Sequence, residues 1–170
     1  MAPYQFIERA SPFNSKGGKT LPVFAVTPAH LETEMVDPVA LEWSKKAGWK
    51  ADSGSLLLVP SETGLLGGAL FGLGKTPSDT PYLTGKLARL LPAGDWHIET
   101  APLTANRLLL GYGLGSYRFE KYKSSSADRP TLMMPADADA ARIKRLLAGV
   151  FLARDLINTP TNDMGPDALE

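Results

Sequence analysis

The amino-acid sequence predicts an α/β fold, in which a mixed β-sheet flanked by helices in three layers is followed by a long linking helix. Short apolar runs alternate with helical segments between residues 21 and 136, and glycine or proline marks most of the boundaries between them. A three-four spacing of apolar residues then fills 137–158, which indicates one long helix. We therefore predict an α/β domain over residues 1–136, a linking helix over 137–158 and the start of another domain at 159–170.

Five segments have the composition of β-strands. The run 55–60 is continuously apolar and follows Gly54, which is typical of a strand buried on both faces. Residues 96–100 alternate with the period of a strand. The predicted strands are 21–27, 55–60, 67–74, 96–100 and 131–134.

Helix signals separate these strands. Asp37 precedes Pro38, as an N-cap residue precedes a proline in the first helical position. The predicted helices before the linking helix are 39–47, 80–91, with Leu83, Leu87, Leu90 and Leu91 on one face, and 103–119. The third contains Gly111, Gly113 and Gly115. Each glycine costs about 1 kcal/mol relative to alanine in a helix, so we expect them to mark a tight contact with another backbone.

The linking helix has both of its ends marked in the sequence. Asp137 and Asp139 are expected to cap the helix and to complement its positive N-terminal end, in preference to binding a cation. Asn158-Thr159-Pro160 ends it. Its apolar residues are predicted to pack against the sheet domain: Ile143, Leu146, Leu147 and Val150.

Composition excludes several classes of site and partner. Eighteen basic and eighteen acidic residues give no net charge, so no steering towards a polyanion or a membrane surface is expected. The absence of cysteine excludes disulfides and thiolate metal ligands. No apolar run approaches the roughly 20 residues of a membrane span, and the first residues do not have the pattern of a signal peptide. We expect a cytoplasmic protein with no membrane partner.

No residue of the chain is assigned a catalytic, metal-binding or cofactor-binding role. The two Gly-Lys-Thr stretches, which end at Thr20 and Thr76, lack the earlier glycine of a phosphate-binding loop. His30 and His97 lie far apart, and neither has a carboxylate at helical ligand spacing. The chain by itself is therefore predicted to be inactive and to bind no metal ion.

One basic and aromatic cluster, at residues 117–123, has the composition of a nucleic-acid contact. Its cations are Arg118, Lys121 and Lys123, and aromatic residues stand between them. A solvated helix end explains the same pattern, and the nearby acidic residues Glu120 and Asp128 favour that interpretation. The cluster leaves an alternative function open, that of a stand-alone α/β module that binds nucleic acid or protein.

Two segments resemble the leucyl (cytosol) aminopeptidase family. LGSYRFEKYK, residues 114–123, is similar to the stretch that follows a small-residue helix in that family, and ARDLINTPTNDMGP, residues 153–166, is similar to its run before the catalytic domain. The order and spacing of the elements also agree with that family, in which an α/β domain and a long helix come before the second segment. The resemblance implies that this chain is the N-terminal, macro-domain-like, non-catalytic domain with its linking helix, ending before the catalytic half.

For the parent protein, the resemblance implies a cytosolic two-metal metallopeptidase that removes N-terminal residues, often leucine, from peptides. Two divalent ions, manganese or zinc, would be held by the catalytic half, which would also bind the peptide. The implied partners of this chain are that catalytic half and the other subunits of a homo-hexamer. The chain would then serve assembly, stability or substrate access. Some relatives bind DNA through this region, so the cluster at 117–123 stays a minor hypothesis.

Overall fold

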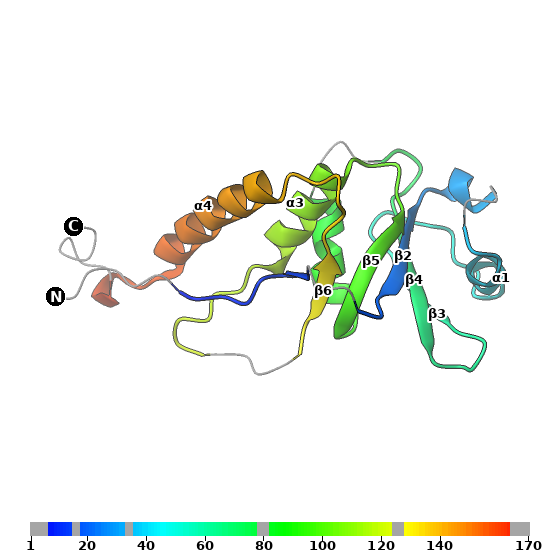
Figure 1. The fold of residues 1–170 in the computed structure, drawn as a ribbon, viewed down its shortest axis with the longest axis horizontal. Helices are drawn as coiled ribbons and strands as arrows, with labels where there is room; N and C mark the ends of the chain where they lie inside the picture. The colour runs from blue at the N-terminus through cyan, green and yellow to red at the C-terminus, as the bar shows by residue number, and fades with distance from the viewer. Residues whose placement is uncertain (1–6, 15–17, 33–35, 78–81, 124–127, 164–170) are drawn as a thin grey trace.

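The computed structural model describes residues 7–14, 18–32, 36–77, 82–123 and 128–163. Figure 1 shows a twisted sheet with helices on its faces and one long helix that extends away from it. The strands are β1 (Phe13–Asn14), β2 (Leu21–Val26), β3 (Leu56–Pro60), β4 (Leu66–Gly72), β5 (Gly94–Thr100) and β6 (Pro130–Met133). The α-helices are α1 (Pro38–Lys46), α2 (Leu87–Leu90), α3 (Ala105–Ser116) and α4 (Ala140–Asn158), and 3-10 turns cover Pro28–Glu32, Leu83–Lys86 and Thr161–Asp163.

The six strands form one mixed sheet in the order β1-β6-β5-β2-β4-β3. Neighbouring strands are parallel except β3 and β4, which are antiparallel. The predicted α/β class with a mixed sheet is confirmed, and each predicted strand is present. The sequence analysis missed β1, because two residues are too short to display a period.

The two faces of the sheet bury different cores. In β2, Val23 and Ala25 point to one face and Phe24 and Val26 to the other, as the two-residue period of a strand requires. The first face packs against α2, α3 and α4, whereas the second packs against α1. Helices therefore lie on both sides of the sheet, which gives the three layers.

The prediction that the 55–60 strand is buried on both faces is wrong. β3 lies at the edge of the sheet, and Leu58 is 40% exposed. The reason is topological: β3 pairs with β4 as an antiparallel hairpin and has no neighbour on its other side. The indole Nε1 of Trp43 in α1 donates to the Leu58 carbonyl oxygen at 3.1 Å, so a side chain covers part of the open edge.

The predicted helix over 80–91 is shorter and less regular than expected. It consists of the 3-10 turn Leu83–Lys86 followed by the single α-helical turn α2, and residues 80 and 81 lie outside the described residues. Leu87 and Leu91 are buried as predicted, but Leu90 is 45% exposed. The backbone tightens at Thr84, whose hydroxyl donates to the Leu108 carbonyl oxygen of α3 at 3.2 Å, and the tighter turn rotates Leu90 away from the core.

The glycines of α3 make the close contacts that the sequence predicts. A Cβ added at Gly115 would overlap the Gly85 carbonyl oxygen and would lie 2.5 Å from the Gly85 Cα. A Cβ added at Gly113 would lie 2.9 Å from Leu147 Cδ2. The backbone of α3 therefore touches the 83–86 turn directly. α3 ends at Ser116, earlier than the predicted residue 119, because Tyr117 has extended backbone angles (φ −57°, ψ 132°).

Gly115→Ala is expected to destabilise the protein by about 1–3 kcal/mol, because the new methyl group meets backbone atoms that cannot rotate away. Gly149→Ala is the matched control in α4. A Cβ there meets nothing within 4 Å, so the better helix former should stabilise the protein by up to about 1 kcal/mol. Urea unfolding of both variants measures the difference. Equal stabilities would contradict the close contact between Gly85 and Gly115.

α4 corresponds to the long helix predicted over 137–158, and it begins at Ala140 instead of residue 137. Its role as a link between two domains stays a prediction. Asp139 is its N-cap and accepts from the Arg142 amide at 2.9 Å. The residues before it form a turn, closed by the Ala138 amide donating to the Pro135 carbonyl oxygen at 3.2 Å. Ile143 and Leu147 are buried as predicted, but Leu146 is 44% exposed. Val150 is only partly buried, so the inward face of α4 is rotated relative to the predicted one.

Candidate functional site at the end of the long helix

The C-terminal half of α4 extends beyond the sheet, and two segments from distant parts of the chain accompany it (Figure 1). Residues 7–12 lead into β1, and residues 117–122 follow α3. Arg9 joins them, since its guanidinium donates to the Arg118 carbonyl oxygen at 3.3 and 3.4 Å. We call the side chains that converge here the Asp155 junction: Arg9, Tyr117, Phe151, Arg154, Asp155 and Asn158.

Asp155 lies at the centre of the junction, with its side chain only 4% exposed. Its carboxylate accepts two hydrogen bonds from the Arg9 guanidinium, one of them at 2.8 Å, and a third from the Tyr117 hydroxyl at 2.9 Å. A buried carboxylate needs a counter-charge and donors for its lone pairs. Arg9 and Tyr117 supply both, so the ion pair fixes residues 7–12 and the end of α3 to α4.

Tyr117 stacks among the other members of the junction. Its ring centroid lies 5.2 Å from each of the Arg9 and Arg154 guanidinium carbons and 5.4 Å from the Phe151 ring, distances typical of cation–π and aromatic contacts. Burial raises the pKa of the Tyr117 hydroxyl, and Asp155 raises it further, while Asn158 and Arg9 act in the opposite direction. The hydroxyl therefore stays protonated and donates to Asp155.

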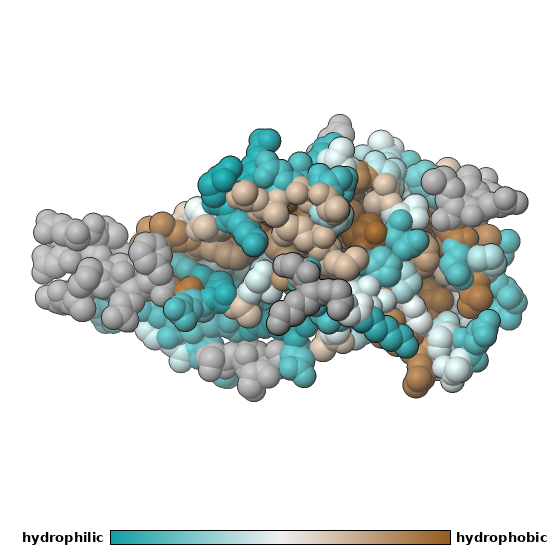
Figure 2. Space-filling view, viewed as in Figure 1, coloured by the Kyte–Doolittle hydropathy of each residue, from teal (hydrophilic) through white to brown (hydrophobic). Residues whose placement is uncertain are grey.

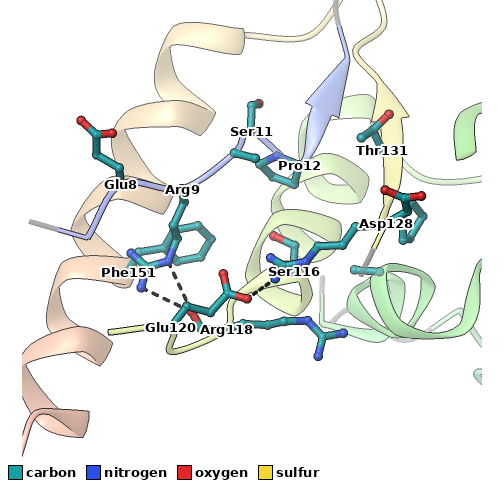
Figure 3. A pocket seen from close by; sticks show the side chains of 14 residues that line it. Glu8, Arg9, Ser11, Pro12, Ser116, Arg118, Glu120, Asp128, Thr131 and Phe151 are labelled. Carbon is teal, nitrogen blue, oxygen red and sulfur yellow. Dashed lines mark hydrogen bonds and ion pairs between the residues drawn. The ribbon is translucent and has the colours of Figure 1, made fainter. Parts of the chain in front are cut away.

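A polar pocket of about 360 Å³ opens beside the junction (Figure 3). Arg9 and Phe151 form its wall on the side of α4, and Glu120 and Arg129 form an ion pair on the side of β6. Charged groups of both signs alternate around the pocket and several are already paired. This lining favours a role in joining the segments of the domain over the binding of one charged ligand.

The structure places Arg118, Lys121 and Lys123 along the segment after α3. Arg118 lines the polar pocket, the Lys121 ammonium lies 5.7 Å from the Tyr122 ring centroid, and Lys123 is exposed. Arg118 therefore lies beside the junction, since Arg9 donates to its carbonyl oxygen, and the two lysines follow it along the same segment. Whether they bind nucleic acid stays a prediction.

The histidines and carboxylates of the described residues do not converge into a metal centre: no three of them gather at one point. His97 contacts Thr20 through Nδ1 and Glu99 through Nε2, each at 2.9 Å. The sequence analysis did not pair His97 with Glu99, although residues two apart on a strand share a face. We assign this row of side chains to the pairing of β2 with β5. Among the described helices, none is long and apolar enough to span a membrane.

The sequence analysis missed the Asp155 junction. Arg9 belongs to a segment for which no element was predicted, and its partner is distant in sequence. One signal was present: Arg154 and Asp155 are the charged residues within the apolar stretch 149–157. Charged groups in such a stretch are stable only when they find partners.

The fold and the junction define a three-layer α/β domain that holds a long helix at one end of its sheet. The family model of the M17 aminopeptidase N-terminal domain matches residues 21–135. The chain belongs to this family, and the resemblance to cytosol aminopeptidases is confirmed. Its place within an enzyme of this class is that of the N-terminal domain.

Individual relatives agree with this assignment. A protein of Shewanella oneidensis described as "probable cytosol aminopeptidase 1" is 31% identical over 133 residues, which cover 66% of this chain and 26% of the relative. The crystal structure of cytosol aminopeptidase from Coxiella burnetii superposes with a TM-score of 0.79 at 28% identity, covering 94% of this chain and 36% of that one. The bottromycin maturation enzyme BotP in complex with Mn shares the fold, with a TM-score of 0.61, 20% identity and coverages of 87% and 34%. This chain therefore spans about a quarter to a third of the length of these relatives.

Proposed function

We propose that this chain is the non-catalytic domain of a cytosolic, two-metal aminopeptidase, and that it serves assembly and stability by holding α4 in a fixed direction. The observation that carries the proposal is the Asp155 junction, which fastens the end of α4 to two segments of the domain. In this proposal, α4 leads into the catalytic domain of the same polypeptide. A helix held at its last turn would set the position of whatever follows it.

Metal-dependent hydrolysis of peptides is assigned to the part of the enzyme beyond this chain. The manganese complex of BotP supports a metal centre in the family. The residues described here do not fit such a centre, because no three potential ligands converge, and metal affinity requires several converging ligands. We therefore assign no step of peptide hydrolysis to them. The names of the relatives support the cytosolic location, and the homo-hexamer remains part of the proposal.

Activity measurements test this proposal. The 170-residue chain is expected to release no leucine from leucine amide in the presence of Mn²⁺ or Zn²⁺, and to bind neither ion stoichiometrically in calorimetry. The protein translated from the complete reading frame is expected to release leucine and to bind the metal ions. Micromolar metal binding by the chain alone, abolished by substituting carboxylates within it, would contradict the proposal. So would a complete reading frame that encodes no metal-binding domain.

A further inference from the structure

Outside the Asp155 junction, residues 149–157 of α4 carry apolar side chains or, at Gly149, none. Within residues 149–157, Arg154 and Asp155 are the charged residues, and both point into the junction. The side chains that face elsewhere are apolar or absent, and Ile157 is 81% exposed. The described part of this domain covers α4 on the side of the junction and leaves apolar side chains exposed on the opposite side, and a contiguous exposed apolar surface is typical of a site of protein contact.

The residues on this side of α4 form a continuous stripe, in which Val150 is half-buried and the others are exposed. A spacing of three and four residues places them on one face of the helix, from Leu146 near the sheet to Ile157 at the far end, and brown and tan atoms follow α4 in Figure 2. At 1.5 Å per residue the stripe is roughly 16 Å long. We call it the outer stripe of α4; it consists of Leu146, Gly149, Val150, Ala153 and Ile157.

Basic side chains border the outer stripe at the end near the sheet. Arg142 and Arg145 are exposed in the first turns of α4, where the helix dipole disfavours cations. Arg142 also lines an apolar groove of about 250 Å³ together with Leu110 and Leu146. An apolar surface with a basic border complements an apolar ridge that has carboxylates beside it.

The comparisons indicate which polypeptide could cover this surface. The matched model is that of an N-terminal domain and ends at residue 135, before α4. The structure from Coxiella burnetii contains far more chain than the 36% that this protein covers. In the proposed enzyme, the catalytic domain follows the C-terminal end of α4. Ile157, whose side chain is exposed, lies beside that end.

We propose that the outer stripe of α4 is the docking surface for the catalytic domain of the same enzyme, through an apolar ridge flanked by carboxylates. This inference rests on the proposed function, since it requires a catalytic domain after α4. It goes further by assigning particular residues to the contact. α4 is then a structural layer shared by two domains, held by the Asp155 junction on one side and covered by the catalytic domain on the other.

Single cysteines test the docking surface, because the chain has no cysteine of its own. Leu146→Cys and Ile157→Cys are placed on the outer stripe. Leu65→Cys is the control, at a position that is 72% exposed in the turn between β3 and β4. An uncharged maleimide is applied to the 170-residue chain and to the protein of the complete reading frame, and labelling at each site is followed by mass spectrometry.

In the 170-residue chain, all three cysteines are expected to react rapidly. In the complete protein, labelling at 146 and 157 should slow by about tenfold or more, because a covered thiol reacts only after a local opening, while the rate at 65 is unchanged. Equal labelling rates in the two proteins would overturn the docking surface. The proposed function would still stand in that case if the complete protein released leucine from leucine amide. Protection that appears in the 170-residue chain as its concentration rises would identify a second copy as the occupant, and would also overturn it.

Discussion

Replacing Leu147 with aspartate is expected to reduce the free energy of unfolding by about 4 kcal/mol or more. The side chain is 5% exposed, and it packs directly over Gly113 in the core between α3 and α4. Deleting a buried leucine side chain alone costs about 2–5 kcal/mol, and a carboxylate at the same place lacks a partner for its charge. Urea unfolding followed by circular dichroism measures the loss.

Leu146→Asp is the matched control for this prediction, since it makes the same chemical change at the neighbouring position. Leu146 is 44% exposed, so its carboxylate stays in water and the expected loss is below about 1 kcal/mol. Similar losses for the two variants would mean that α4 does not face the sheet as described. A Leu147→Asp variant as stable as the parent would contradict the core packing of α4.

Removing the carboxylate at the centre of the Asp155 junction is expected to have a comparable effect. Asp155→Ala leaves the Arg9 guanidinium, whose side chain is 16% exposed, without its counter-charge. The Tyr117 hydroxyl also loses its acceptor. Breaking a buried ion pair from one side costs about 3–5 kcal/mol. Hydrogen exchange should accelerate in the last turns of α4 and in residues 7–12, and chemical unfolding measures the overall loss.

A double substitution separates the ion pair from simple packing. Arg9→Met combined with Asp155→Leu removes both charges and retains apolar bulk, so it should recover a large part of the stability lost in Asp155→Leu alone. Arg9→Met alone should be destabilising, because it leaves the carboxylate buried and unpaired. If the double variant were as unstable as the sum of the single ones, the two side chains would not be coupled and the junction would not act as a unit.

Several elements could be predicted because their signals are local. Asp37 accepts from the amides of Val39 and Ala40, as its place before Pro38 predicts. β2 follows the apolar run 21–27, and α4 follows the three-four spacing that ends before Pro160. The contact of Gly115 with Gly85 was indicated by glycines in a helix, where they need a compensating close approach. The sequence did not indicate that Gly85 is the partner of Gly115, because Gly85 belongs to another element.

The sequence by itself determined the class of fold, the strands of the mixed sheet other than β1, and the family. Strand and helix periods, caps and the segments 114–123 and 153–166 are patterns of neighbouring residues. Only the tertiary structure decided that β3 is an edge strand, that Leu147 and not Leu146 faces the core, and that Arg9 meets Asp155. These outcomes depend on the order of strands and on the rotation of one helix against another. Both are set by the sum of many weak contacts between residues far apart in the chain, and no local pattern records that sum.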